Sequence, residues 1–304
     1  MLKSQSPKRK LKMICNICPR RCGAIRVGAS NTGGYCKAGE TLRVARAGLH
    51  RFEEPFISGE RGSGTVFFSR CSLGCVFCQN GEISHGGFGK DITVNRLADI
   101  FRELVAAGAH NINLVTPTHY SYAIKKALDI YRPQVPIVYN TSGYELPEVI
   151  KSLSGYVDVF LFDYKYFNAD SALKYSNAPD YPEFAKSALL AAYISKGECV
   201  FGSDGIIKSG VVVRHLLLPG ATAEAISVFD FVKENTPGAY FSIMNQYVPL
   251  GAALDMPVIS RKVTEREYEK VLAHIIDSGF KNCCYQERGS ADTRYIPNFD
   301  LSGV

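Results

Sequence analysis

The sequence predicts an α/β protein with a mainly parallel sheet and a small cysteine-rich arm at its N-terminus. Two observations predict this fold: short, near-continuous apolar runs alternate with helical patterns, and seven of the ten cysteines precede residue 80. The chain of 304 residues fits one α/β barrel of roughly 200–250 residues with an appendage, or two domains. Residues 1–12 lack the apolar stretch of a secretory signal, and the chain has no membrane-length apolar run. We therefore expect a cytoplasmic protein that has no membrane partner.

The predicted strands are apolar on both faces. Parallel strands that are covered on both faces by helices have this pattern, whereas half-exposed strands alternate apolar and polar residues. The six runs are 64–69, 111–116, 136–141, 157–164, 211–218 and 240–246.

Helical patterns fill the intervals between these runs. Thr93 can cap a helix whose apolar residues from Leu97 to Val105 recur at spacings of three and four, with Gly108 near its end. Further helices are predicted at 122–131, 146–153, 182–196, 223–234 and 264–278. Six βα units with short loops imply right-handed crossovers. Both a doubly wound sheet and an incomplete barrel satisfy this pattern.

The charge of the chain is concentrated at its start. The net charge is +6, yet residues 1–39 hold nine basic residues and no acid, so the remaining chain has 26 basic residues against 29 acidic ones, a net −3. A body that binds nucleic acid should itself be basic, so nucleic-acid binding is disfavoured outside the arm. We interpret Lys8, Arg9 and Lys10 as a solvated tail.

One cysteine group directly follows the first predicted strand. Cys71, Cys75 and Cys78 have the spacing C-x3-C-x2-C. A loop at this point projects from the carboxyl edge of the sheet, where active sites of α/β proteins lie. Three thiolates can ligate three irons of a four-iron cluster and leave the fourth iron open to a small molecule. This arrangement points to catalysis.

A zinc site is the alternative for these three cysteines. A histidine distant in sequence would then supply the fourth ligand, with His85, His119 and His215 as the candidates.

The spacing and the aromatic Phe77 just before Cys78 resemble the signature of radical S-adenosylmethionine (SAM) enzymes. The chain also resembles glycyl-radical-enzyme activating proteins, in particular the pyruvate formate-lyase activating enzyme-like group. This resemblance runs from about Cys15 to Gly251, and segment 59–84 is its most specific part. The resemblance implies a partial parallel (β/α)6 barrel. With it we expect a basic, cysteine-rich arm over 1–50 and a core barrel with a C-terminal extension over 51–304.

The resemblance also implies how the cofactors bind. Cys71, Cys75 and Cys78 would ligate a [4Fe–4S] cluster whose fourth iron is chelated by the amino and carboxylate groups of SAM. Phe77 would pack beside the cluster and the adenine. These activases use their cluster and SAM to make a 5′-deoxyadenosyl radical that removes hydrogen from the substrate, so the resemblance implies an oxidoreductase.

Five further residues are candidates for SAM contacts. The family's Gly-Gly-Glu-type motif is absent, and Thr116 and Thr118 stand in the corresponding stretch as acceptors for the SAM ammonium group. Asp163 and Lys165 resemble the activases' Asp-x-Lys motif, although an ion pair between them is the alternative. Arg214 resembles the arginine that faces the SAM carboxylate, and a charge inside an apolar strand requires an anionic partner.

A second cysteine group lies in the arm. Cys15, Cys18, Cys22 and Cys36, spaced C-x2-C-x3-C-x13-C, supply four thiolates, enough for zinc or a second iron–sulfur cluster. A structural metal that stabilises a core-poor arm is the preferred interpretation, and an electron relay is the alternative.

Three functions therefore stand at this stage. The first is hydrogen abstraction from the backbone glycine of a glycyl-radical enzyme, with a reductant such as flavodoxin or ferredoxin. The second is the same chemistry on another peptide, a nucleotide or a small metabolite. The third is a zinc-stapled nucleic-acid-binding protein, which rests on the basic arm alone.

Overall fold

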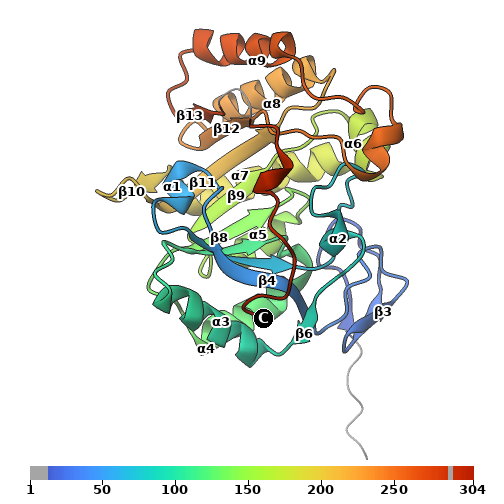
Figure 1. The fold of residues 1–304 in the computed structure, drawn as a ribbon, viewed down its shortest axis with the longest axis vertical. Helices are drawn as coiled ribbons and strands as arrows, with labels where there is room; N and C mark the ends of the chain where they lie inside the picture. The colour runs from blue at the N-terminus through green and yellow to red at the C-terminus, as the bar shows by residue number, and fades with distance from the viewer. Residues whose placement is uncertain (1–12, 287–289) are drawn as a thin grey trace, which may run out of the picture.

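A large sheet dominates the computed structural model, which describes residues 13–286 and 290–304. Its ten strands lie in the order β13-β12-β11-β9-β8-β7-β5-β4-β6, and β10 pairs with β11. Neighbouring strands from β5 to β13 along this path are parallel. In the described residues the two end strands, β13 and β6, do not pair with each other, so the sheet is a partial barrel (Figure 1).

The six predicted strands are confirmed. They correspond to β5 (Ser63–Phe68), β7 (Ile112–Val115), β8 (Ile137–Thr141), β9 (Val159–Asp163), β11 (Ile207–Leu216) and β12 (Tyr240–Met244). Every residue of β5, β7 and β8 is buried, as the near-continuous apolar runs require. The added strands are short or lie on the edge side: β4 (Leu42–His50), β6 (Lys90–Ile92), β10 (Val200–Phe201) and β13 (Cys283–Tyr285).

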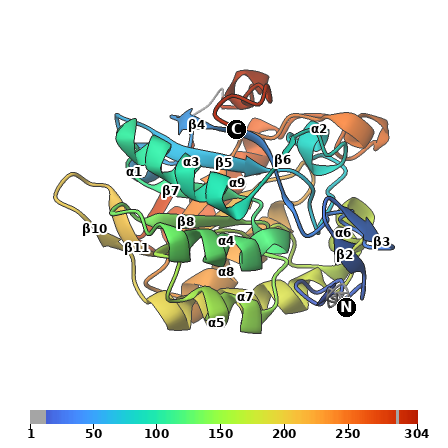
Figure 2. The ribbon, with the colours of Figure 1, turned by 90° about the horizontal axis from the view of Figure 1, so that it is seen from below.

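Helices form an outer layer in which α3 packs on α4, α4 on α5, α5 on α7 and α8 on α9 (Figure 2). Thr93 caps α3 as predicted, because its side chain accepts a hydrogen bond from the Arg96 backbone N–H. The helices are α1 (Pro55–Ser58), α2 (Gly81–Ser84), α3 (Val94–Ala106), α4 (Ser121–Ile130), α5 (Pro147–Leu153), α6 (Ala169–Ser176), α7 (Tyr181–Lys196), α8 (Thr222–Asn235) and α9 (Glu265–Asp277), with 3-10 turns Thr118–Tyr120, Gly251–Asp255 and Thr293–Tyr295. None of the helices in the described ranges is long and apolar enough to cross a bilayer.

The N-terminal lobe, residues 13–41, contains a small antiparallel sheet of β1 (Met13–Ile14), β2 (Ile25–Val27) and β3 (Ser30–Thr32). Residues 42–50, which the sequence assigned to the arm, instead form β4 and pair with β5 and β6 in the main sheet. The arm's own fold therefore ends before β4. The basic residues Lys8, Arg9 and Lys10 lie outside the described residues.

The C-terminal segment, residues 290–304, returns to the N-terminal part of the sheet. The Leu301 backbone N–H donates to the Ala45 carbonyl at 3.0 Å, and the Ala47 N–H donates to the Ser302 carbonyl at 2.8 Å. Arg46 adds an ion pair with Asp300 at 3.0 Å. The segment thus runs along β4 and crosses the front of the sheet (Figure 1).

Candidate active site

A pocket opens at the carboxyl ends of the parallel strands. Its walls come from the loop after β5 and from the ends of β7, β8, β9, β11 and β12, and the C-terminal segment forms one side. Of the nine residues proposed for the cluster and SAM, all but one line this pocket. The lining residues are Cys71, Cys75, Phe77, Cys78, Thr116, Asp163, Lys165 and Arg214 among the predicted ones, with Glu53, Asn80, Asn140, Ser142, Gln246 and Tyr295 among the others.

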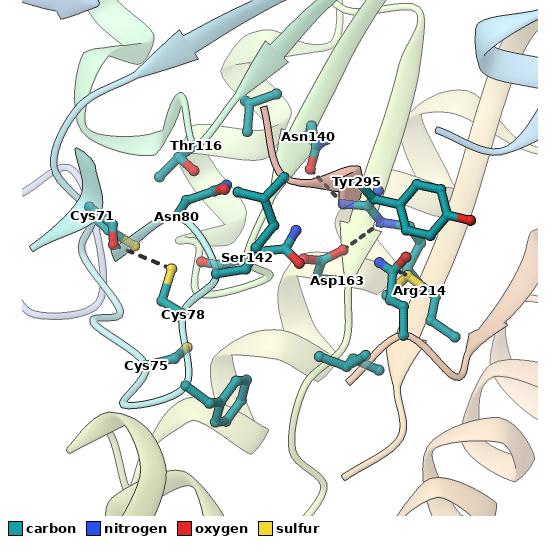
Figure 3. Close-up of a pocket in the computed structure, with 18 of the residues that line it drawn as sticks. Cys71, Cys75, Cys78, Asn80, Thr116, Asn140, Ser142, Asp163, Arg214 and Tyr295 are labelled. Atoms are coloured by element: carbon teal, nitrogen blue, oxygen red, sulfur yellow. Dashed lines mark hydrogen bonds and ion pairs between the residues drawn. The ribbon is translucent and has the colours of Figure 1, made fainter. Parts of the chain in front are cut away.

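The cysteine loop, residues 71–78, turns its three thiols toward one side of this pocket (Figure 3). Each sulfur has a hydrogen-bond donor: the Leu73 backbone N–H for Cys71 at 3.4 Å, the Ser176 hydroxyl for Cys75 at 3.1 Å and the Ser84 hydroxyl for Cys78 at 3.3 Å. Donors at these positions stabilise thiolate sulfur and tune the properties of a bound metal group.

Burial governs the chemistry of these thiols. Burial first, and then the neighbouring thiols, raise the pKa of Cys71 to about 12, and the same two causes raise the pKa of Cys78 above its ordinary value. Three thiolates gathered at one wall would therefore repel each other without a cationic group between them. The donor set, three soft sulfurs at an open pocket, fits a cluster that keeps one iron free.

A single metal ion fits this site poorly. No three His, Cys, Asp or Glu side chains in the described parts of the chain converge closely enough to hold one ion. The cysteines of a four-iron cluster bind separate irons, so they need no such convergence. The histidines proposed for zinc are absent from the pocket lining. His119 instead contacts the Ser69 carbonyl at 2.9 Å, and burial lowers its pKa to about 3, while His215 contacts the Tyr164 carbonyl at 2.7 Å.

An ion network forms the wall opposite the thiols (Figure 3). The Arg214 guanidinium donates to Asp163 Oδ1 at 2.6 Å, to Glu53 Oε2 at 2.8 Å and to Asn140 Oδ1 at 2.8 Å. Lys165 Nζ donates to Asp163 Oδ2 at 2.8 Å. Burial alone would raise the pKa of Asp163, but the Arg214 and Lys165 cations outweigh it and hold that pKa below its ordinary value.

Comparison with known proteins identifies the family. Residues 65–232 match the family described as the radical SAM superfamily, which is more than half of the chain. The chain belongs to the radical SAM superfamily. The span begins in β5 and ends in α8, so it contains the cysteine loop and the ion network except for Glu53.

The chain is also 30% identical over 267 residues to the uncharacterized protein MJ0674 of Methanocaldococcus jannaschii, covering 85% of this chain and 73% of that protein. Among solved structures, SuiB of Streptococcus suis superposes with a TM-score of 0.49 at 15% identity. That superposition covers 73% of this chain and 48% of SuiB, so the chain spans about half the length of SuiB.

In this radical SAM chain, Phe77 lies at the end of the cysteine loop among three tyrosine rings. Its ring is buried and makes edge contacts with Tyr166, Tyr175 and Tyr247 at centroid distances of 6.4, 6.3 and 5.8 Å. These contacts fix the end of the cysteine loop between α6 and the strand ends.

The two threonines in the stretch that corresponds to the Gly-Gly-Glu-type motif lie in different surroundings. Thr116 lines the pocket and has φ of 59°, a left-handed conformation that is costly for a β-branched residue and is found at functional sites. Thr118 does not line the pocket. Its hydroxyl donates to Glu145 Oε1 at 2.6 Å in the core, because the 3-10 turn after Thr116 rotates it away from the strand ends.

Several pocket residues escaped the sequence analysis. Glu53 and Glu54 precede α1, and only the fold brings them to Arg214, 161 positions away for Glu53. Asn80 Oδ1 and Ser142 Oγ are buried and have no hydrogen-bond partner among the described residues. The two adjacent acids just before Pro55 are a local signal for Glu53, whereas Asn80 and Ser142 have no local signal.

The four arm cysteines share the N-terminal lobe. Cys15, Cys18 and Cys36 are buried, and Cys22 is exposed. Burial first, and then the neighbouring Cys36 and Cys15 thiols, raise the pKa of Cys18 well above its ordinary value. Arg26 is only 4% exposed, directs Nη2 to Cys36 Sγ at 3.6 Å and leaves Nε without a partner in the described structure. A cation thus lies buried beside these thiols.

Proposed function

We propose that this protein binds a [4Fe–4S] cluster through Cys71, Cys75 and Cys78 and cleaves SAM reductively in the adjacent pocket. The observation that carries the proposal is the position of three thiols from one short loop opposite a partly buried ion network at the carboxyl edge of the sheet. Cluster and SAM together supply a 5′-deoxyadenosyl radical, which removes hydrogen from a substrate. The protein supplies binding, orientation and exclusion of water.

The ion network suits the carboxylate of SAM. Arginine has five N–H donors, and Arg214 uses three of them on Asp163, Glu53 and Asn140. The three acceptors fix the guanidinium plane, and two N–H groups remain for a carboxylate. Arg214 is therefore held by the protein's own acids and is already oriented before SAM binds.

The unpartnered polar atoms suit the ammonium group of SAM. Asn80 Oδ1 and Ser142 Oγ lie between the thiols and the ion network in Figure 3, and both lack hydrogen-bond partners in the described residues. Because buried acceptors normally find a donor, these two atoms are suited to receive one from a ligand. With the Thr116 hydroxyl they replace the missing Gly-Gly-Glu-type acceptors.

The charge balance favours a cationic ligand. SAM carries a sulfonium, an ammonium and a carboxylate. The pocket pairs Arg214 and Lys165 with Asp163 and Glu53, and a third carboxyl, Glu54, lies 3.9 Å from Arg214. Burial raises the pKa of Glu54 despite the nearby Arg214, so a bound cation would favour its ionised form.

Electron paramagnetic resonance of the anaerobically reconstituted, reduced chain tests this proposal. We expect a cluster signal that changes when SAM is added, because SAM chelates the open iron. Arg214→Lys should keep the cluster signal but need more SAM to shift it. A wild-type cluster signal that stays unchanged at saturating SAM would rule the proposal out.

For the substrate, we propose the backbone glycine of a partner protein, on the resemblance of segment 59–84 to the activating enzymes. A flavodoxin or ferredoxin would supply the electron. One observation favours a second candidate, a small molecule or free peptide: the C-terminal segment adds Tyr295, Ile296 and Pro297 to the lining of the pocket, where they take up space beside the strand ends.

Deuterium transfer separates the two substrates. A fully deuterated cell extract is divided by size and each fraction is added to the reconstituted enzyme. Deuterium in 5′-deoxyadenosine that comes from the macromolecular fraction, with a glycyl-radical signal in that fraction, supports the protein substrate. Deuterium from the small-molecule fraction alone supports the second candidate.

For the arm, we propose that Cys15, Cys18, Cys22 and Cys36 bind a structural metal, which requires their thiols to turn toward one point, since in the described residues no three of them converge on one. The support is the burial of three thiols and the adjacent Arg26 cation, whose charge would offset that of thiolates. Zinc and iron are measured together in the protein purified without reconstitution. About one equivalent of zinc that is lost in Cys18→Ser supports the proposal, whereas wild-type protein with no bound metal contradicts it.

A further inference from the structure

Arg20 connects the N-terminal lobe to the cysteine loop. It lies between Cys18 and Cys22, and its guanidinium donates to four backbone carbonyls outside the lobe. Two of the acceptors belong to the cysteine loop, Ser72 at 3.1 Å from Nε and Leu73 at 3.2 Å from Nη2.

The other two acceptors lie at the end of α6. Nη2 donates to the Ser176 carbonyl at 2.9 Å, and Nη1 donates to the carbonyl of Asn177, the left-handed residue that ends the helix. Helix ends leave carbonyls without intrahelical partners, and an arginine side chain can satisfy them. One side chain thus joins three segments that are far apart in sequence.

The end of α6 supports the cysteine loop from a second direction. The Ser176 hydroxyl donates to Cys75 Sγ at 3.1 Å and contacts the Tyr166 hydroxyl at 2.7 Å. The Val76 backbone N–H donates to the Tyr175 carbonyl at 2.9 Å. Arg20 therefore contacts the two segments that together position the thiol of Cys75.

Aromatic packing fixes Arg20 itself. Its guanidinium carbon lies 3.8 Å from the ring centroid of Tyr35, and the Tyr35 hydroxyl donates to the Leu73 carbonyl at 3.4 Å. Gly74 is in the left-handed region with φ of 71°, and a Cβ there would lie 3.0 Å from the Tyr35 hydroxyl oxygen. The lobe therefore packs directly against the turn of the cysteine loop.

We propose that Arg20 is a positioning residue for the cluster, through which the N-terminal lobe holds the cysteine loop in its ligating conformation. The inference rests on the proposed cluster site but assigns a role that the cluster ligands do not have. Neutral carbonyls accept all four hydrogen bonds, so these contacts do not neutralise the positive charge of the guanidinium. The charge therefore lies close to the cluster site. Net charge near an iron–sulfur cluster affects its reduction potential.

Hydrogen–deuterium exchange on the full chain without a cluster tests whether Arg20 holds the cysteine loop in place. In Arg20→Ala, we expect backbone amides of 72–78 and 173–178 to exchange on the order of tenfold faster than in the wild type. Arg20→Lys should fall between the two, because a single nitrogen cannot reach all four carbonyls. The matched control is Arg21→Ala, since Arg21 is adjacent, carries the same charge and is exposed. Among the described residues, its side chain has a distant contact, 5.9 Å from the ring of Phe184.

Electron paramagnetic resonance and redox titration of the reconstituted variants test whether Arg20 affects the cluster itself. Arg20→Ala should shift the cluster signal and lower its reduction potential relative to Arg21→Ala. Equal exchange in Arg20→Ala and Arg21→Ala would overturn the inference, and so would faster exchange with an unchanged signal and potential.

If Arg20→Ala fails to fold by circular dichroism, Tyr35→Leu replaces it, because it removes the ring that supports the guanidinium. The same two readouts decide the outcome for that variant. A wild-type chain that takes up no cluster would refute the proposed function instead, and the exchange data would still report on the contact between lobe and loop.

Discussion

The two cysteine groups of this chain have the same side-chain chemistry but opposite surroundings. Cys71, Cys75 and Cys78 line an open pocket with an ion network across from them. In the N-terminal lobe, Cys15, Cys18 and Cys36 are buried, and none of these three lines that pocket. Thiols beside a cavity can bind a group that also holds a ligand, whereas thiols inside packed structure leave no room for a substrate beside the bound group. The surroundings, more than the cysteine spacing, separate a catalytic group from a structural one.

The largest expected effect comes from removing one cysteine of the catalytic group. Cys75→Ala should lower the iron content of the reconstituted protein from about four per chain to the background level, because the cluster loses one of three ligands. Inductively coupled plasma mass spectrometry measures the iron. Cys199→Ala, which lies outside both groups, is the control and should keep its iron. A Cys75→Ala chain with full iron would show that the pocket thiols are not the cluster ligands.

The second effect tests whether the ion network belongs to the catalytic pocket. Arg214→Ala leaves the partly buried Asp163 and Glu53 without their cation, and this should cost about 3 kcal/mol of unfolding free energy, the lower end of the cost of breaking a buried pair. SAM affinity, measured by calorimetry, should fall as well. Arg132→Ala removes an exposed pair with Asp158 and should cost at most about 1 kcal/mol. Unchanged SAM affinity in Arg214→Ala would remove Arg214 from the SAM site.

The third effect concerns the boundary between the lobe and the barrel. Glu145 is fully buried and accepts hydrogen bonds from Thr118, Thr141 and Tyr139. Burial raises its pKa from 4.5 to about 7, although those hydrogen bonds oppose the shift. The folded state therefore binds an extra proton, and stability falls as the pH rises from about 4.5 to about 7.

Glu145→Gln removes this dependence, because glutamine is neutral and still accepts the hydroxyl hydrogen bonds. At pH 8 the variant should be more stable than the wild type by roughly 3 kcal/mol, and the two should converge near pH 4.5. Urea unfolding at several pH values measures this difference. Glu148→Gln, an exposed acid in the first turn of α5, is the control. Parallel pH profiles for wild type and Glu145→Gln would show that Glu145 is ionised in the fold.

The smallest effect separates a strained pocket residue from a relaxed core residue. Thr116→Gly should stabilise the fold by about 1 kcal/mol, because glycine tolerates the left-handed backbone at this position. The same change should weaken SAM binding by removing a hydroxyl from the pocket. Thr118→Ser keeps its hydroxyl bond to Glu145 but loses a buried methyl group, so it should leave SAM binding unchanged and destabilise the fold by about 1 kcal/mol. Thermal unfolding and calorimetry measure both, and a destabilised Thr116→Gly would contradict the strain argument.

Local patterns predicted most of the elements. The buried strands appear as near-continuous apolar runs, and Thr93 marks the start of α3. Helix α6 was missed because its eight residues are largely polar and its end is set by Asn177 in a left-handed conformation. Strand β4 was assigned to the arm because pairing with β5 depends on tertiary contact.

The site was predictable only where the chemistry is local. The cysteine loop has its ligands within eight positions, so its spacing revealed it. Arg214 was predicted to face an anion, and in the structure it donates hydrogen bonds to two carboxylates of the protein itself, Glu53 and Asp163. The link from Arg20 to Asn177 joins residues 157 positions apart. Such contacts depend on the packing of whole segments, which no local pattern contains.

The formation of 5′-deoxyadenosine tests the central claim most directly. The full chain is reconstituted with iron and sulfide under anaerobic conditions, reduced with dithionite, mixed with SAM and analysed by chromatography, with iron and zinc measured in the same sample. We predict 5′-deoxyadenosine and methionine from the wild type and none from Cys75→Ala. A sample with a verified cluster and bound SAM that yields no 5′-deoxyadenosine, even when cell extract is added as a source of substrate, would contradict the account.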